Sequence, residues 1–346
     1  MAIYQFILTP VDQFFFGGEK HDTKGETINY FVESNPYPQQ TTILGLVRYY
    51  LLLKHNLIGT DKIKAEGEDL IGLSSFDFDT KKQLFGKIES ISPLYFVNQG
   101  NNYFPAPFDV EHEIDKEYGY YFMHKSGKKF ISKDYFPPMK VIDSAGQIGP
   151  LLLGSSATEC IVYPTQHTGN EKGERGESKE DAFYKQAYMK MKPGWGFAFD
   201  ANITEEVTEE ELYINFGGEK SLFSLKVCKI EKSSSPCTRL PLDRNNLYGF
   251  YCLSDCFSEP QLLENTCFAV TKAVSFRNFQ SSIKTKNYAV YNPKDPDGMI
   301  RGNRFNLLAR GSVLYFKTKA KRDEASEFLD KPNCTNIGFN NYLKIN

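Results

Sequence analysis

Basic side chains and aromatic rings gather in the C-terminal third of the chain. Residues 271–322 hold twelve Lys and Arg against two Asp, a local charge of +10 over 52 residues. Cations bind phosphates and flat rings stack on unpaired bases, so this mixture favours single-stranded nucleic acid as a ligand. The alternative is a set of solvated faces whose rings alternate into the core. The phosphate candidates in this segment are Arg277, Arg301, Arg304 and Arg310.

The residues that could support catalysis form no recognisable motif. The five histidines are scattered, and only His21 lies near a glycine loop and beside a lysine, Lys20. A histidine in that setting could act as a general base in RNA cleavage, although a polar loop residue is the simpler interpretation. No phosphate-binding P-loop, G-x-S-x-G or H-E-x-x-H pattern occurs in the sequence. We therefore expect a chain without catalytic activity and without a cofactor.

The seven cysteines are odd in number and irregularly spaced. Four of them could form a zinc site, but their spacings match none of the usual zinc patterns: Cys228, Cys237, Cys252 and Cys256. We expect inert reduced thiols and no metal. No signal peptide and no stretch of membrane-spanning length is recognised, which predicts a cytoplasmic protein without membrane contact.

The net charge of −2 excludes a binding argument based on total charge, so any such argument must be local. Residues 116–140 are weakly basic. Residues 200–219 carry seven acids and no Lys or Arg, and such a patch could instead face a basic protein neighbour.

The strands and helix expected from the sequence would position these residues. They indicate an α+β protein rich in antiparallel strands. Aromatic residues make up 14% of the chain, with one Trp among them, and they favour strands. We expect a first strand over 4–8 and a helix from Thr41 or Thr42 to Leu53, with apolar residues at helical spacing and a threonine as its cap. Later strands are expected at 195–199, 212–216, 222–227, 247–253, 268–276 and 311–316.

Two further segments shape the expected organisation. Residues 169–181 (GNEKGERGESKED) contain no hydrophobic side chain. Because such a segment cannot bury apolar surface, we expect a disordered loop there. A serine-rich stretch beginning at Ser233 suggests a domain boundary near residue 230. The motif Phe-Gly-Gly-Glu-Lys occurs at 16–20 and again at 216–220, which we interpret as a coincidence between short glycine turns.

Several segments in this order resemble one known family. Residues 38–48 (PQQTTILGLVR) resemble the first-helix motif of the RAMP superfamily of CRISPR proteins. Residues 213–221 (YINFGGEKS) resemble the glycine hairpin of its Cmr-type member, and residues 309–316 (ARGSVLYF) resemble that member's late strand. Gly338, Phe339 and Asn340 resemble its closing glycine turn, which is shorter here than is typical of the superfamily.

The resemblance implies two ferredoxin-like (RRM-like) domains, over 1–230 and 231–346, with insertions at about 100–190 that include a thumb hairpin. It implies a non-catalytic subunit at the foot of a type III-B Cmr effector complex in antiviral defence. Such a subunit grips the repeat-derived 5′ tag of the crRNA, abuts the large polymerase-like subunit and the backbone subunits, and meets target RNA only indirectly.

Residues that match the motifs become candidate RNA contacts. Glycine turns let backbone N–H groups approach phosphates, a helix N-terminus favours an anion, and glutamines can bond base edges or sugars. Arg48, one helical turn further on, could equally form a surface salt bridge. Together with the four arginines above, the candidates are Lys20, His21, Gln39, Gln40, Thr41, Thr42, Arg48, Gly217, Gly218, Lys220 and Asn340.

Two alternatives stay open from the sequence. The first is a metal-independent endoribonuclease of the same superfamily that processes precursor crRNA, with His21 as its base. The second is a module that binds only protein partners through the acidic residues 200–219.

Overall fold

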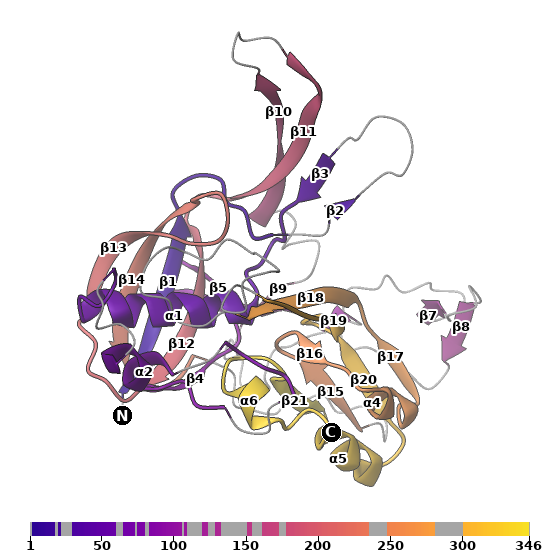
Figure 1. Ribbon diagram of the computed structural model, residues 1–346. Helices are drawn as coiled ribbons and strands as arrows, with labels where there is room; N and C mark the ends of the chain where they lie inside the picture. Colours follow the sequence, from indigo (N-terminus) through magenta and orange to yellow (C-terminus); the bar gives the residue numbers. More distant parts are fainter. Residues whose placement is uncertain are drawn as a thin grey trace.

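The computed structural model shows a mixed α/β protein with mostly antiparallel sheets (Figure 1). The residues it describes are 2–17, 20–21, 30–59, 65–72, 75–79, 83–105, 107–108, 120–123, 129–132, 151–153, 161–172, 178–234, 248–280 and 300–345.

The N-terminal part is built on an eight-stranded sheet with β1 (Ala2–Pro10) near its middle. β1 pairs antiparallel with β12 (Trp195–Ile203) on one side and β14 (Leu222–Ile230) on the other. Beyond β14 lies β13 (Glu210–Asn215), the last strand on that side. Beyond β12 come β5 (Tyr95–Asn98), β6 (Asn101–Pro105) and β9 (Leu151–Leu153), while β4 (Ile88–Ile91) also pairs with β12.

Helix α1 (Gln40–Lys54) packs on one face of this sheet through the apolar residues that the sequence places at helical spacing. Alternate residues of β1 (Tyr4, Phe6 and Leu8) are fully buried in the same core, and the Phe6 and Tyr50 rings meet edge to face at 5.5 Å. The predicted helix is confirmed, but its predicted threonine cap is wrong. Gln39 occupies the N-cap position and makes no side-chain cap hydrogen bond. The short helix α2 (Ala65–Ile71) follows.

A long antiparallel hairpin projects from this body (Figure 1). It consists of β10 (Val162–Lys172) and β11 (Ser178–Met191), and β11 also pairs with β3 (Tyr30–Glu33), which in turn pairs with β2 (Lys20–His21). The predicted disordered loop at 169–181 is therefore wrong at both of its ends, because 169–172 and 178–181 belong to the hairpin. A hairpin satisfies its backbone hydrogen bonds without apolar side chains, so composition alone misled the prediction. A smaller hairpin joins β7 (Tyr120–Met123) and β8 (Lys129–Ser132).

The C-terminal part contains a second, four-stranded sheet in the order β17-β20-β15-β21. Along the chain its elements alternate as β15 (Tyr248–Cys252), α4 (Pro260–Glu264), β17 (Phe268–Val270), β20 (Val313–Phe316), α5 (Lys319–Ser326) and β21 (Tyr342–Ile345). The strand predicted over 268–276 divides into two strands of different sheets. Its second half begins β18 (Ala273–Gln280), which pairs with β19 (Ile300–Leu308), and β19 pairs with β16 (Cys256–Phe257).

An aromatic cluster joins the two parts. Phe78 stacks on Phe257 at 4.4 Å and lies 5.2 Å from the Phe305 ring, while Phe76 lies 5.7 Å from Phe339. Polar contacts surround these rings. The Asn333 side chain donates to the carbonyl of Asp77 at 2.8 Å, and the Ile91 N–H donates to the carbonyl of Asn336 at 2.7 Å. Helix α6 (Pro332–Thr335) lies at this junction. The two parts therefore form one packed body.

The turn after α6 fits against the start of α1 with no room for a side chain. Gly338 is buried and has a φ of +91°, and a Cβ atom there would lie 1.9 Å from Gln40 Nε2 and 2.6 Å from the Ser92 carbonyl oxygen. The same Gln40 nitrogen donates to that carbonyl at 3.1 Å. This contact joins the two parts of the chain.

The connection between the two parts is fixed where it leaves the first sheet. The buried Asp200 carboxylate accepts hydrogen bonds from the Tyr95 hydroxyl at 2.6 Å and the Ser233 hydroxyl at 2.8 Å, and from the Ser234 N–H. Desolvation by burial raises the pKa of Tyr95, so its hydroxyl stays protonated and donates. Because Gln5, which donates to the Tyr95 hydroxyl, alternates with Tyr4 and Phe6, this cluster lies on the sheet face opposite α1.

Gly338→Ala should destabilise the protein more than Gly100→Ala. Both glycines have a positive φ, but a Cβ at Gly100 meets nothing within 4 Å. The two variants share the backbone strain of a left-handed alanine, and only Gly338→Ala adds overpacking, which costs about 1–3 kcal/mol. Urea denaturation of both variants measures the difference in unfolding free energy. If both variants lose the same unfolding free energy, the structure around Gly338 accommodates a methyl group and the prediction is wrong.

Candidate nucleic-acid interface

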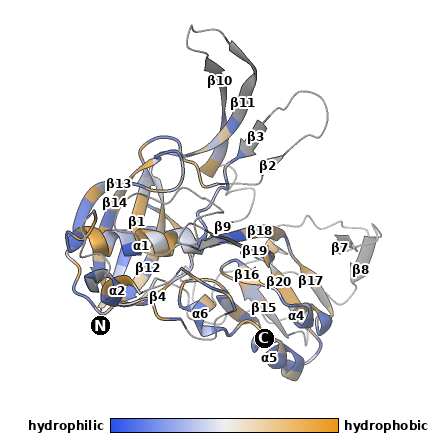
Figure 2. Ribbon diagram, viewed as in Figure 1, coloured by the Kyte–Doolittle hydropathy of each residue, from blue (hydrophilic) through white to orange (hydrophobic). Residues whose placement is uncertain are grey.

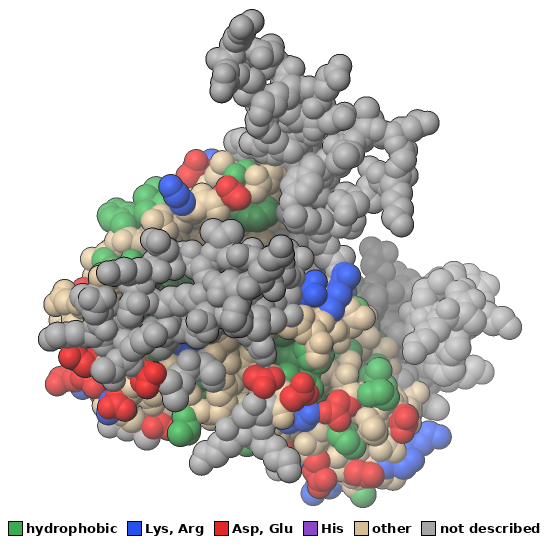
Figure 3. Space-filling view, viewed as in Figure 1, with side chains coloured by type: hydrophobic (Ala, Val, Ile, Leu, Met, Phe, Trp, Pro, Cys, Tyr) green, Lys and Arg blue, Asp and Glu red, His purple; other side chains and the backbone are tan. Residues whose placement is uncertain are grey.

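Strands β18 and β19 present a basic face to solvent and an aromatic face to the core. Phe276 and Phe305 stand opposite each other in the ladder and pack against Phe257. The next pair, Arg277 and Arg304, is also directly opposite, and both side chains are exposed on the other face. In the space-filling view, Lys and Arg side chains gather over this hairpin (Figure 3).

Each of the two guanidiniums is anchored at its Nε atom. Arg277 donates to the Gly302 carbonyl and Arg304 to the Ser275 hydroxyl, each at 3.0 Å. Like charges placed directly opposite on neighbouring strands repel each other and destabilise the pair. A bound phosphate between them would offset that repulsion. Two fixed guanidiniums side by side are therefore suited to a polyanion.

Arg301 lies in the same ladder, opposite Phe279. Lys20 and His21 form the short strand β2. The side chains of Arg301, Lys20 and His21 lie outside the described residues, so the structure shows only which strands these three residues belong to. Gly18 lies outside the described residues altogether.

The structure corrects the phosphate role predicted for Arg310. Its side chain is only 7% exposed, and its Nη2 atom lies 3.1 Å from an oxygen of Asp255. The same carboxylate accepts the Arg310 backbone N–H at 2.9 Å, and the guanidinium sits 4.4 Å from the ring centre of Tyr37. Because a buried ion pair loses much stability when broken, this arginine serves the junction between the two parts and does not reach a ligand.

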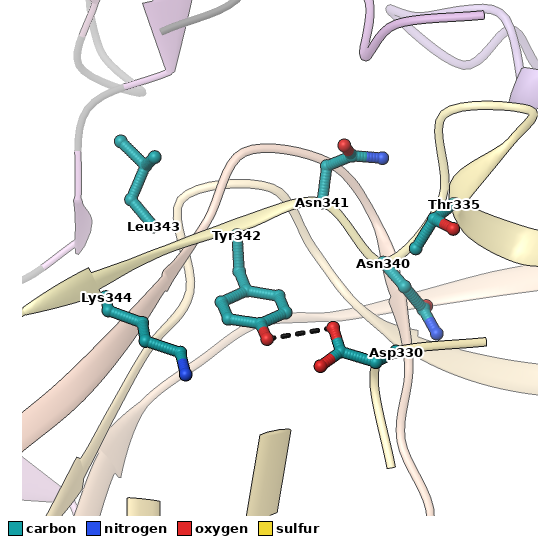
Figure 4. A pocket seen from close by; sticks show the side chains of 7 residues that line it. All are labelled: Asp330, Thr335, Asn340, Asn341, Tyr342, Leu343 and Lys344. Atoms are coloured by element: carbon teal, nitrogen blue, oxygen red, sulfur yellow. Dashed lines mark hydrogen bonds between the residues drawn. The ribbon is translucent and has the colours of Figure 1, made fainter. Parts of the chain in front are cut away.

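Asn340 and Gln40 are also internal, contrary to the RNA contacts predicted for them. Asn340 accepts the Phe257 N–H at 2.8 Å and donates to the Leu329 carbonyl at 3.0 Å. It lines a surface hollow of about 380 Å³ beside β21, where the Tyr342 hydroxyl donates to Asp330 at 2.9 Å (Figure 4). Gln40 is 1% exposed, and its amide contacts Ser92 at the junction described above.

The other candidate residues in the first turn of α1 remain partly accessible. Gln39, Thr41 and Thr42 are half-buried, and no acidic residue lies in the first turn. The helix dipole favours an anion at this end. Arg48 lies further along the helix with its guanidinium 5.5 Å from the Phe85 ring centre, and burial lowers its pKa to about 10. Its side chain packs against the protein rather than reaching outward.

The two Phe-Gly-Gly-Glu-Lys motifs meet in space. The Gly218 N–H donates to the Phe15 carbonyl at 2.7 Å, the Phe15 N–H donates to the Ser221 hydroxyl at 3.0 Å, and the Phe16 and Phe216 rings lie 5.3 Å apart. Our interpretation of the repeat as a coincidence overlooked this contact, because nothing in the spacing of about 200 residues indicates that the copies are neighbours. A Cβ at Gly217 would lie 2.7 Å from the Phe15 carbonyl oxygen, so this position requires glycine.

The turn that follows Gly218 carries Lys220 in an unusual backbone conformation. Glu219 and Lys220 both have a φ of 54°, and the Ser221 N–H donates to the Gly218 carbonyl at 3.1 Å. Two consecutive left-handed residues closed by such a bond define a type I′ turn, which favours Asn-Gly. Glu and Lys therefore occupy the turn at a cost in stability, and Lys220 is exposed at its tip.

The five cysteines within the described residues are free, as the sequence predicted for reduced thiols. Cys252, Cys256 and Cys334 are buried, and burial raises the pKa of Cys334 to about 12. Among the described residues, no group of three His, Cys, Asp or Glu is arranged to hold a metal ion. No helix in the described ranges is both long and apolar enough to cross a membrane.

Comparison with solved structures finds distant similarity. A chain of "Cryo-EM structure of the Type III-B Cmr-beta bound to cognate target RNA" is 14% identical, with a TM-score of 0.48, over 98% of this chain and 96% of that one. A chain of "Crystal structure of Csm3-Csm4 subcomplex in the type III-A CRISPR-Cas interference complex" is 11% identical, with a TM-score of 0.36, over 91% and 97%. Comparison with curated proteins finds no match.

A family model gives the stronger evidence. The model described as "CRISPR-associated protein (Cas_Cmr3)" matches residues 6–159 and 158–346, and so spans nearly the whole chain. This agrees with the resemblance carried by the first helix, the glycine hairpin and the late strand. The protein therefore belongs to the Cas_Cmr3 family of CRISPR-associated proteins, and the predicted kinship with Cmr-type RAMP subunits is confirmed.

Proposed function

We propose that the chain is a non-catalytic, RNA-binding subunit of a type III-B CRISPR effector complex that holds the repeat-derived 5′ tag of the crRNA. The observation that carries this proposal is the pair Arg277 and Arg304, exposed and directly opposite each other on β18 and β19. Family membership supplies the class of complex. The partners are then the crRNA, the large polymerase-like subunit and the backbone subunits.

Strand order supports two ferredoxin-like domains as the frame. The C-terminal elements follow a β-α-β-β-α-β succession with the sheet order β21-β15-β20-β17. The N-terminal sheet has the related order β14-β1-β12-β5, with α1 between β1 and β5 and strand β13 in place of a second helix. The hairpin β10–β11 is our candidate for the thumb, since it projects from the body.

The first sheet offers little open platform for bases. In RRM-like domains the exposed sheet face carries the stacking rings. Here Ser233 and Ser234, which follow β14, occupy part of that face through hydrogen bonds to Asp200 and Gln5. This arrangement favours RNA contacts at the basic hairpin, the first turn of α1 and the Lys220 turn instead.

The endoribonuclease alternative is less well supported. It depends on His21, whose side chain lies outside the described residues, so no contact in the structure supports a catalytic base there. We therefore keep the scaffold role as the proposed function.

Arg277→Ala with Arg304→Ala should weaken binding of tag RNA at least tenfold. Each lost phosphate contact should also lower the slope of log affinity against log salt by about 0.7. Fluorescence anisotropy with labelled tag RNA at several salt concentrations measures both. The control is Lys319→Ala with Lys321→Ala, which removes the same charge from the exposed side of α5. Equal affinity of the two double variants would contradict the assignment of the hairpin.

Glu219→Asn and Lys220→Gly should each stabilise the protein by about 1 kcal/mol, because both new residues tolerate the left-handed conformation better. Lys220→Gly should also weaken tag RNA binding, whereas Glu219→Asn should not. Thermal unfolding and the same anisotropy assay separate the two effects. A stabilised Lys220→Gly variant with unchanged affinity would remove Lys220 from the interface.

A further inference from the structure

Three apolar side chains stand exposed at the end of the first sheet. Tyr213 is 71% exposed, Val11 54% and Leu222 43%. Leu222 lies opposite Asn215 in the β13–β14 ladder, and the Val11 N–H donates to the Leu222 carbonyl at 3.0 Å. Tyr213 is two residues from Asn215 and therefore shares its face. Figure 3 shows hydrophobic side chains gathered in the region where Figure 1 places β13 and β14.

This apolar face is distinct from the core. Ile214, Phe223 and Leu225 alternate with the exposed residues and are buried on the α1 side. Ser233, which binds Asp200 on the outer face, leaves these three side chains exposed. We name Val11, Tyr213 and Leu222 the edge cluster.

The strand that carries Tyr213 also ends the sheet. β13 pairs with β14 on one side, and within the described ranges no strand pairs with its other side. An edge strand keeps a row of backbone donors and acceptors that can pair with an added strand. Proteins protect such edges or use them to bind extended segments of partners.

The negative charge near this edge strand indicates which kind of partner could bind it. Five Glu and no Lys or Arg occur over residues 204–211, which lead into β13. Glu210 is paired with Lys54, and Glu205 lies 3.8 Å from His55. Glu206, Glu209 and Glu211 are exposed, and no ion pair with a Lys or Arg side chain is found for them among the described residues. Glu209 accepts the Lys229 backbone N–H and Glu211 accepts the Ser224 hydroxyl, each at 2.9 Å, so each of these two carboxylates is held in place by one oxygen. The nearest base in the ladder is Lys226, opposite Glu211.

We propose that the β13 edge and the edge cluster dock an extended, basic segment of a neighbouring protein subunit, which adds to the sheet as a strand. The exposed carboxylates would pair with its Lys or Arg, and its apolar side chains would pack on Tyr213 and Leu222. RNA is disfavoured here because the same carboxylates repel phosphates. A second copy of this chain is disfavoured because both copies would bring the glutamates of residues 204–211 to one interface, with no Lys or Arg in that segment to pair with them.

The test uses the chain co-expressed with the other subunits encoded for its type III complex. Tyr213→Ser with Leu222→Ser, and separately Glu209→Lys with Glu211→Lys, should each cause loss of one and the same subunit from the purified assembly, with at least a tenfold fall in its occupancy by native mass spectrometry. The matched control is Leu84→Ser with Leu263→Ser, which removes two other exposed leucines and should assemble normally.

A photo-crosslinking residue at position 213 identifies the occupant. The expected product joins Tyr213's position to a Lys- or Arg-rich segment of that subunit. Normal assembly of both edge variants, or a crosslink to RNA or to a second copy of this chain, would overturn the proposal. Tag RNA affinity of each isolated variant is measured in parallel, so failure of the RNA-binding role is recognised separately from failure of the docking role.

Discussion

The architecture depends on one contact in which a glycine leaves room for the other part of the chain to approach closely. Gly338, in the turn after α6, lies against the Gln40 amide and the Ser92 carbonyl of the N-terminal part. Around it, the aromatic cluster of Phe76, Phe78, Phe257 and Phe339 excludes water. The start of α1, the β18–β19 hairpin and the last turn of the chain therefore keep fixed positions relative to one another. A ligand that spans them meets a preformed surface rather than two parts that must first be aligned.

The same junction explains which predicted residues fail as RNA contacts. Gln40, Arg310 and Asn340 are polar, belong to family-like motifs and lie near glycines, yet each is buried with partners inside the protein. Polar groups bonded inside the protein in this way are held by the fold and are not available to a ligand. Motif resemblance indicates which residues matter but does not distinguish these two reasons. Arg277 and Arg304 differ because their strands alternate and direct them outward.

Periodic patterns of apolar residues predicted the helices and strands most reliably. Helix α1 was predicted from its apolar spacing, and strands β12, β13, β14, β15 and β20 lie where alternation or apolar runs placed them. The failures involve information that is not periodic. Helix α1 begins after Gln39 without a side-chain cap, and backbone pairing forms the hairpin ends at 169–172 and 178–181. The contact between Phe15 and Gly218 joins residues about 200 positions apart in the sequence. The family resemblance supplied the identity of the chain, but the alternation of Arg277 with Phe276 required the ladder register.

The position of β1 has a consequence for how the chain is made. This strand is synthesised before both of its neighbours, β12 and β14, which lie about 190 residues or more later in the sequence. At translation rates of about 5–20 residues per second, β1 stays unpaired for roughly 10 seconds or longer. The first sheet thus cannot be completed until β14, which ends at Ile230, is synthesised, and its contact order predicts slow folding. A nascent chain of this kind exposes the apolar side chains of β1 to chaperones and to aggregation before its own sheet can enclose them.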